Sequence, residues 1–174
     1  MQICKGGELS DVKPWRGAAI YRNQDLIFIG TQSGYSVSIA DPDGGSYFLD
    51  TDADDETLGR CLNDALLKSR FITPQQRAEN PLFFDFRLVG ENYKKWVDGL
   101  LTRFGYKTKQ TLFKKMILCH AKVVDGVLTL DPNCHDKLEA WEGLGDDAKV
   151  ILPFDSPEAE IGAALRVALD RCIP

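Results

Sequence analysis

Four short runs of apolar or alternating residues occupy the first third of the chain. The runs are GAAIYR, DLIFIG, YSVSIA and SYFLD, between residues 17 and 50. They are rich in β-forming side chains, and turn-forming residues such as Asp41-Pro42-Asp43-Gly44-Gly45 separate them. The pattern predicts a meander of short antiparallel strands.

Three later segments have apolar residues at helical spacing. The first covers residues 58–69, and the carboxylates at 54–56 suit the positive end of its dipole. The second runs from residue 93 to 104 and is followed by Gly105, a good C-terminal cap. Ser156-Pro157-Glu158 predicts the start of the last helix, with Ser156 as N-cap.

The remaining segments give shorter elements. MILCHAKV and VLTL flank Val124-Asp125-Gly126, which predicts a β-hairpin. KVILPF, from residue 149, is typical of a buried strand. We also expect a strand in LFFDFRLV, residues 82–89, and a short helix within residues 133–142.

Two of the helical segments resemble each other at an offset of 103 residues. Leu58-Gly59 corresponds to Ile161-Gly162, and the next three apolar positions also correspond. Glycine inside a helix costs ~1 kcal/mol, so we expect a compensating close contact, most simply with a sheet. The likeness is either the chance similarity of two amphipathic helices or an internal pseudo-repeat, with halves at residues 15–72 and 112–174.

Length and composition favour one globular domain. The chain has 174 residues, of which 44% are hydrophobic and 27% charged. The five cysteines are widely spaced, without a CxxC pair, and the N-terminus lacks the apolar middle of a signal peptide. We therefore predict one α/β (α+β) domain, residues 1–174, located in the cytoplasm and not in a membrane. A twisted, largely antiparallel sheet should carry three or four packed helices.

Charge is segregated along the chain. No lysine or arginine occurs between Arg22 and Arg60, and the eight carboxylates there give a net charge of −8. Residues 94–122 carry +7 and residues 123–163 carry −8. Two acidic segments repel phosphate, which argues against direct nucleic-acid binding, and they attract a basic protein.

Turns and helix caps explain part of the first acidic segment, but they do not explain the absence of basic residues. Tyr47 and Phe48 nearby are either apolar anchors for a partner or core residues of a strand. The carboxylates predicted to contact a partner are Asp41, Asp43, Asp50, Asp52, Asp54, Asp55 and Glu56.

Candidate catalytic and metal sites are incomplete. Cys119-His120 lies in a predicted strand, so its two side chains point to opposite faces and do not favour one metal ion. The Asp50–Asp55 cluster begins like a calcium loop but has Asp55 where glycine is required. It could hold Mg²⁺ in a hydrolase, although no base or phosphate cradle is near. We predict no catalytic residue, cofactor or metal.

Several short motifs, in order, resemble the immunity proteins of bacterial contact-dependent growth inhibition (CDI) systems over residues 15–172. They are Thr57-Leu58-Gly59 with Ala65-Leu66; Trp96 with Phe104-Gly105-Tyr106-Lys107-Thr108; Met116 with Cys119; Asp131-Pro132; Trp141-Glu142-Gly143; and Ile161-Gly162 with Ala164-Leu165 and Ala168-Leu169.

This resemblance implies a non-enzymatic inhibitor that binds the toxic C-terminal domain of an effector delivered by a neighbouring cell. Many such toxins are nucleases that act on tRNA, and an acidic protein would block their phosphate-binding surface. Two alternatives are a metal-dependent hydrolase or nuclease that uses the Asp50–Asp55 cluster, and a small regulatory protein-binding module.

Overall fold

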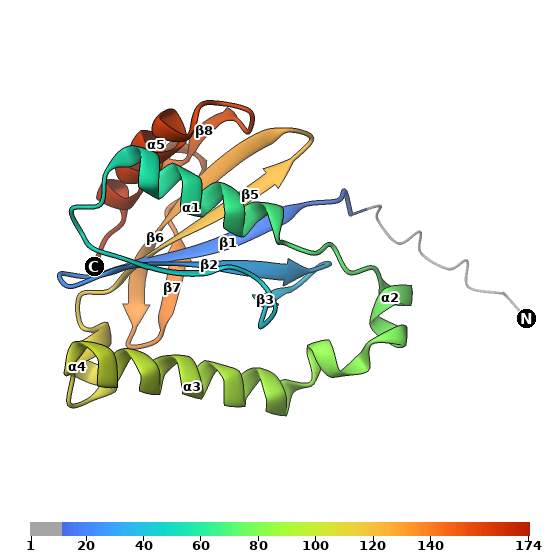
Figure 1. Cartoon of the computed structure of the whole chain (residues 1–174), viewed down its shortest axis with the longest axis horizontal. Coiled ribbons are helices and arrows are strands. Elements are labelled where there is room, and N and C mark those ends of the chain that lie inside the picture. The colour runs from blue at the N-terminus through green and yellow to red at the C-terminus, as the bar shows by residue number, and fades with distance from the viewer. Residues whose placement is uncertain (1–11) are drawn as a thin grey trace, which may run out of the picture.

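The computed structural model describes residues 12–174, which form one α+β domain, as predicted. Its described strands make one curled antiparallel sheet in the order β3-β2-β1-β5-β6-β7, and β4 and β8 pair with β2 and β6 (Figure 1). The strands are β1 (Arg16–Arg22), β2 (Ile27–Gly34), β3 (Ser38–Ala40), β4 (Ser46–Leu49), β5 (Ile117–Val124), β6 (Val127–Lys137), β7 (Ala140–Gly143) and β8 (Val150–Pro153).

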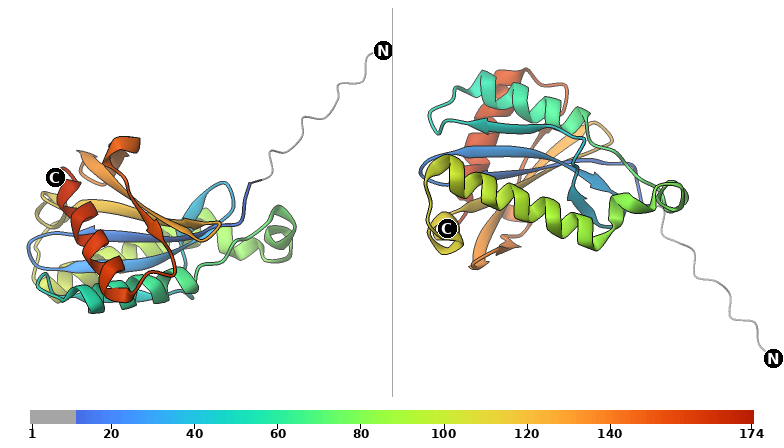
Figure 2. Two further views of the ribbon diagram at one scale, coloured as in Figure 1. Left: turned by 90° about the horizontal axis from the view of Figure 1, so that it is seen from above. Right: turned by 60° about the horizontal axis from the view of Figure 1, so that its bottom comes forward.

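Helices cover both faces of this sheet. α1 and α5 lie side by side, and α3 crosses on the other side (Figure 2). The helices are α1 (Asp55–Leu67), α2 (Pro74–Glu79), α3 (Phe86–Phe104), α4 (Lys109–Phe113) and α5 (Glu158–Arg171), with short 3₁₀ turns η1 (Pro81–Phe84) and η2 (Asp146–Ala148). No helix within residues 12–174 has both the length and the apolar character needed to cross a bilayer.

The two faces of β1 and β2 carry separate cores. Ile20 and Ile29 pack into a cluster with α1 and α5, whereas Tyr21 and Phe28 pack into a second cluster with α3 and α4. Successive residues of a strand point to opposite faces of the sheet, so the side chains of neighbouring residues pack into different cores. The run DLIFIG is apolar at almost every position because both faces of β2 are covered.

Most of the predicted elements are confirmed, and two assignments were wrong. Residues 82–89 form η1 and the first turn of α3 because the Asp85 side chain accepts hydrogen bonds from the N–H groups of Arg87 and Leu88. Residues 133–142 form the end of β6 and most of β7. Trp141 holds that hairpin by donating from Nε1 to the Met116 carbonyl, 2.9 Å away.

The helix ends follow the sequence signals closely. Of Asp52 and Asp54, either of which could cap α1, Asp54 is the cap. Gly105 ends α3 in the left-handed conformation at φ 69°, as predicted. At α5 the N-cap position is occupied by Pro157, one residue later than the prediction for Ser156, and no side chain caps the helix.

A reciprocal glycine contact joins α1 to α5. A Cβ at Gly59 would overlap the carbonyl oxygen of Glu158, and a Cβ at Gly162 would overlap the carbonyl oxygen of Asp55. The glycines therefore permit close packing of two helices on each other, not on the sheet as expected. The offset of 103 residues relates Gly59 to Gly162 and Asp55 to Glu158, so each contact is the counterpart of the other. The pseudo-repeat itself stays a prediction.

Alanine at Gly59 should push the two helices apart. We expect Gly59→Ala to lower the free energy of unfolding by about 2–3 kcal/mol, because backbone atoms must move to make room. Denaturant unfolding would measure the loss. Gly99→Ala in α3 is the matched control, since nothing lies within 4 Å of its added Cβ. It should stabilise the protein by up to ~1 kcal/mol, and equal effects at both sites would contradict the packing argument.

Candidate partner-binding surfaces

The seven carboxylates that were predicted to contact a partner form two groups, one at each end of α1. Asp41 and Asp43 meet Arg70, just beyond the C-terminus of α1. The other five, from Asp50 to Glu56, surround its N-terminus. A helix of this length spans roughly 20 Å, so the set divides into two surfaces.

Asp41 is a buried structural residue. Its side chain is 0% exposed and accepts hydrogen bonds from Arg70 Nε at 2.7 Å and from Ser33 Oγ at 2.6 Å. Burial alone would raise the pKa of this carboxyl, but these bonds and the Asp43 N–H lower it below the usual value. Asp41 is therefore inaccessible to a partner, in contrast to its prediction as a contact residue.

Two carboxylates near the start of α1 also have roles within the fold. Asp54 accepts from the Thr57 N–H at 2.7 Å, and that bond lowers the pKa of Asp54. Asp55 pairs with Arg166 Nε of α5 at 2.8 Å. Both arginines that neutralise the acidic stretch, Arg70 and Arg166, come from outside it, so the sequence did not reveal them.

The remaining carboxylates near the start of α1 are free for a partner. Asp50, Asp52 and Glu56 are exposed and form no ion pair within the described residues. The glycine contact sets the backbone of Glu158 against Gly59, so the first turn of α5, with Glu158 and Glu160, packs against α1. The two acidic segments of the sequence therefore meet where these helices cross. We call this surface the acidic crossing and define it by Asp50, Asp52, Asp54, Asp55, Glu56, Glu158 and Glu160.

Tyr47 and Phe48 belong to the cores rather than to an open surface. Tyr47 packs against the cluster under α1, and its hydroxyl accepts from Lys68 Nζ at 3.1 Å. Phe48 packs on Phe28 at a centroid distance of 5.0 Å, and the Arg103 guanidinium covers it. Of the two roles considered for these residues, the structure supports the core role.

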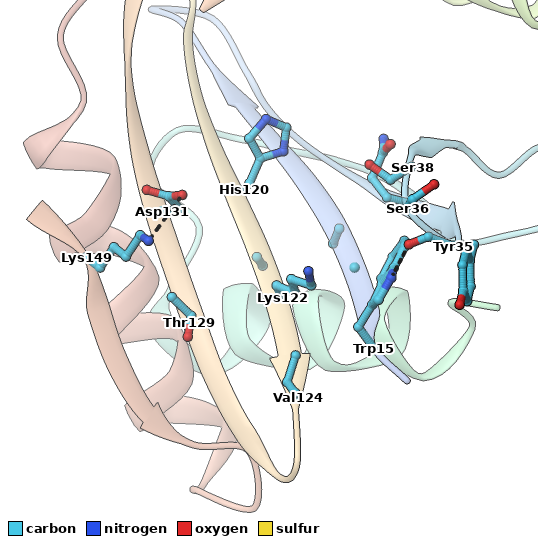
Figure 3. Close-up of a pocket in the computed structure, with 14 residues that line it drawn as sticks. Trp15, Tyr35, Ser36, Ser38, His120, Lys122, Val124, Thr129, Asp131 and Lys149 are labelled. Carbon is cyan, nitrogen blue, oxygen red and sulfur yellow. Dashed lines mark hydrogen bonds and ion pairs between the residues drawn. The ribbon is translucent and has the colours of Figure 1, made fainter. Parts of the chain in front are cut away.

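A hollow of about 530 Å³ opens on the sheet face opposite α1 and α5 (Figure 3). Trp15 closes one side and donates from Nε1 to the Tyr35 carbonyl at 2.7 Å, while His120 and Lys122 stand on β5. Partial desolvation there lowers the pKa of His120, against the opposing effect of Asp131. The sequence analysis missed this hollow, although polar residues alternate with apolar ones along β5.

The two Cys-His pairs of the sequence, Cys119-His120 and Cys134-His135, do not assemble into a metal centre. Cys119 points into the helix-covered core near Cys172, whereas His120 lines the hollow on the other face. Within residues 12–174, no three His, Cys, Asp or Glu side chains gather closely enough to hold an ion. Cys4 lies outside the described residues, and the other four cysteines are free thiols.

An α+β domain with a group of exposed carboxylates where two helices cross is typical of a protein that binds a basic partner. The sequence profile of CdiI, the CDI immunity protein, matches residues 16–172. The chain belongs to this family of immunity proteins, which are non-enzymatic toxin inhibitors.

Known proteins resemble the chain over nearly its full length. Immunity protein CdiI-YPIII from Yersinia pseudotuberculosis serotype O:3 (strain YPIII) is 37% identical, with 94% of this chain and 99% of the relative covered. The CdiA-CT/CdiI toxin and immunity complex from Yersinia pseudotuberculosis contains a chain with TM-score 0.86 and 38% identity, covering 93% and 99%. A protein of unknown function from Neisseria meningitidis gives TM-score 0.83 and 34% identity, covering 93% and 98%.

The Asp41–Arg70 pair should make stability depend on pH. Because folding lowers the pKa of Asp41, its contribution is full above the unfolded pKa near 4 and is lost as pH falls through the folded pKa. Asp41→Asn should therefore cost about 2 kcal/mol at pH 7 and progressively less below pH 4. Urea unfolding between pH 2.5 and 7 would measure this, with exposed Asp136→Asn as control. A constant difference across that range would refute the ionic role of Asp41.

Proposed function

We propose that this immunity protein binds and neutralises the cognate CdiA-CT toxin domain in the cytoplasm, and that this toxin is an RNase acting on tRNA. Membership of the CdiI family supports the binding role. A related immunity protein has been solved together with a CdiA-CT toxin. The assignment of the toxin as a nuclease rests on the charge of the immunity protein.

The acidic crossing is the observation that carries this proposal. An RNase presents lysine and arginine to the phosphates of its substrate, and a surface of carboxylates competes for those groups. Opposite charges also steer the two proteins together, so association can be fast at low salt. Two acidic segments from distant parts of the chain meet here, which enlarges the surface beyond either segment alone.

The predicted contact residues differ in whether they also have a role within the fold. Asp50, Asp52 and Glu56 are available for a partner at no cost to the fold. Asp54 and Asp55 combine a structural role with partial exposure, and Asp43 belongs to the second surface. Because Asp54 and Asp55 already cap and brace the helices, a metal-dependent hydrolase built on the same cluster would keep only Asp50 and Asp52 as free carboxylate ligands.

The hollow is a second candidate surface for the toxin. Its volume is about 530 Å³, and a protein pocket of this size with a polar rim can receive an inserted segment. A toxin held there would approach the sheet from the face opposite the acidic crossing. Separate variants of the two surfaces therefore distinguish the modes of binding.

Removing free carboxylates from the acidic crossing should slow toxin binding. We expect the triple variant Asp50→Asn, Asp52→Asn, Glu56→Gln to reduce the association rate about tenfold at low salt and to flatten its salt dependence. Stopped-flow measurements with a catalytically inactive cognate toxin domain would test this. Asp50, Asp52 and Glu56 form no ion pair within the described residues, but Glu56 lies in the first turn of α1, where its charge favours the helix dipole. We therefore expect the triple variant to lose no more than ~1 kcal/mol of stability.

A matched triple variant removes three negative charges from a different part of the surface. Asp136, Glu142 and Asp147 are exposed and lie in the second acidic segment, on β6, β7 and η2 and not on α1 or α5. If only this second triple variant slows association, the contact lies there. If neither triple variant slows association and the toxin is still neutralised, the electrostatic part of the proposal is wrong. Copurification of an untagged toxin domain separates immunity from a general regulatory role.

A further inference from the structure

A groove of about 210 Å³ lies between β3 and the segment that leads into α3, beside Asp43. Its polar lining consists of Asp43, Asn80 and Asn92. Apolar side chains form most of the remaining wall: Ile39, Pro42, Leu82, Phe83, Leu88 and Val89. The groove thus places one carboxylate and two side-chain amides around an apolar channel.

Asp43 has unused capacity to accept hydrogen bonds. Its side chain is 77% exposed, and its one ion pair is with Arg70 Nη2 at 3.2 Å. Arg70 is mainly committed to Asp41, which it holds through both Nε and Nη2. A carboxylate has about four acceptor positions, so Asp43 can bind a second cation from outside the chain.

Arg70 also fixes one wall of the groove. Its guanidinium carbon lies 4.9 Å from the centroid of the Phe83 ring. The same arginine therefore ties the buried Asp41, the exposed Asp43 and the aromatic wall into one unit. This arrangement exists before any partner arrives, which reduces the entropy lost on binding.

Large apolar side chains are exposed to solvent in the segment that carries the groove. α2 and η1 contribute no buried residue to the core. Leu82 is nevertheless 64% exposed, and Phe86, at 87%, is the most exposed large apolar side chain of the described residues. Exposed apolar side chains that flank a polar anchor are typical of a surface covered by another protein.

We propose that this groove binds one lysine or arginine side chain of the toxin domain, with Asp43 as the ion-pair partner. Such side chains have an apolar stem and a charged head, and they match an apolar channel that ends in a carboxylate. The two asparagine oxygens accept further N–H groups, and Leu82, which lines the groove and is 64% exposed, covers the apolar stem. The statement that this cation comes from the toxin rests on the function proposed above, because an RNase presents a basic surface.

Asp43→Asn tests the ion pair with little risk to the fold, since Arg70 keeps its bonds to Asp41. Calorimetry with the inactive cognate toxin domain should show about tenfold weaker binding for Asp43→Asn and about threefold weaker binding for Leu82→Ala. The exposed control Asp136→Asn should bind like the wild type. Thermal unfolding of each variant would show whether a loss of affinity merely reflects a loss of folding.

A probe without toxin tests the groove directly. Titration with arginine ethyl ester should shift the NMR amide signals of Ile39, Leu82 and Val89 in the millimolar range, and Asp43→Asn should abolish the shifts. Absence of shifts in the wild type, together with unchanged toxin affinity for Asp43→Asn, would overturn the proposal.

Two further outcomes separate this groove from the wider function. If the triple variant of the acidic crossing weakens toxin binding but Asp43→Asn and Leu82→Ala do not, the groove proposal fails and the proposed function stands. If Leu82→Ala and Phe86→Ser change only the self-association seen in sedimentation, the surface joins two copies of this chain and the groove proposal also fails.

Discussion

The crossing of α1 and α5 at Gly59 and Gly162 is the contact on which the rest of the domain depends. Each glycine lets its helix rest on a backbone carbonyl of the other. Side chains at these positions would hold the helices apart and open the core that Leu62 and Leu165 fill. The same crossing sets Glu158 against Gly59 and Asp55 against Gly162, so a packing requirement of two helices also creates the acidic crossing.

The sequence predicted elements well where the signal is local. Hydrophobic period, the Asp54 cap and Gly105 each act within a few residues, and the corresponding strands and helices are present. The two wrong assignments have different causes. Residues 82–89 contain four β-forming and three helix-forming residues, and the Asp85 cap, a local signal that the prediction overlooked, decides for helix. The β6–β7 hairpin depends on Trp141, which packs against Tyr21 and Phe113 far away in sequence.

The candidate site was predictable in composition but not in geometry. The stretch without lysine or arginine did identify exposed carboxylates at the surface. It could not show that Arg70 and Arg166 return to neutralise Asp41 and Asp55, because those pairs span 29 and 111 residues. It also treated the carboxylates as one patch, whereas the length of α1 divides them. The hollow was missed because Trp15, His120 and Lys149 converge only through the order of strands in the sheet.

The separation of these surfaces limits how one partner can dock. A standard interface covers about 800 Å² of each protein, equivalent to a disc roughly 30 Å wide. The acidic crossing and the Asp43 groove are roughly 20 Å apart along α1, so one such interface can include both. The hollow lies on the other face of the sheet, where His120 and Lys122 alternate with the core residues Cys119 and Ala121. A standard-sized toxin contact at the acidic crossing therefore leaves the hollow uncovered, and a contact within the hollow leaves the crossing exposed.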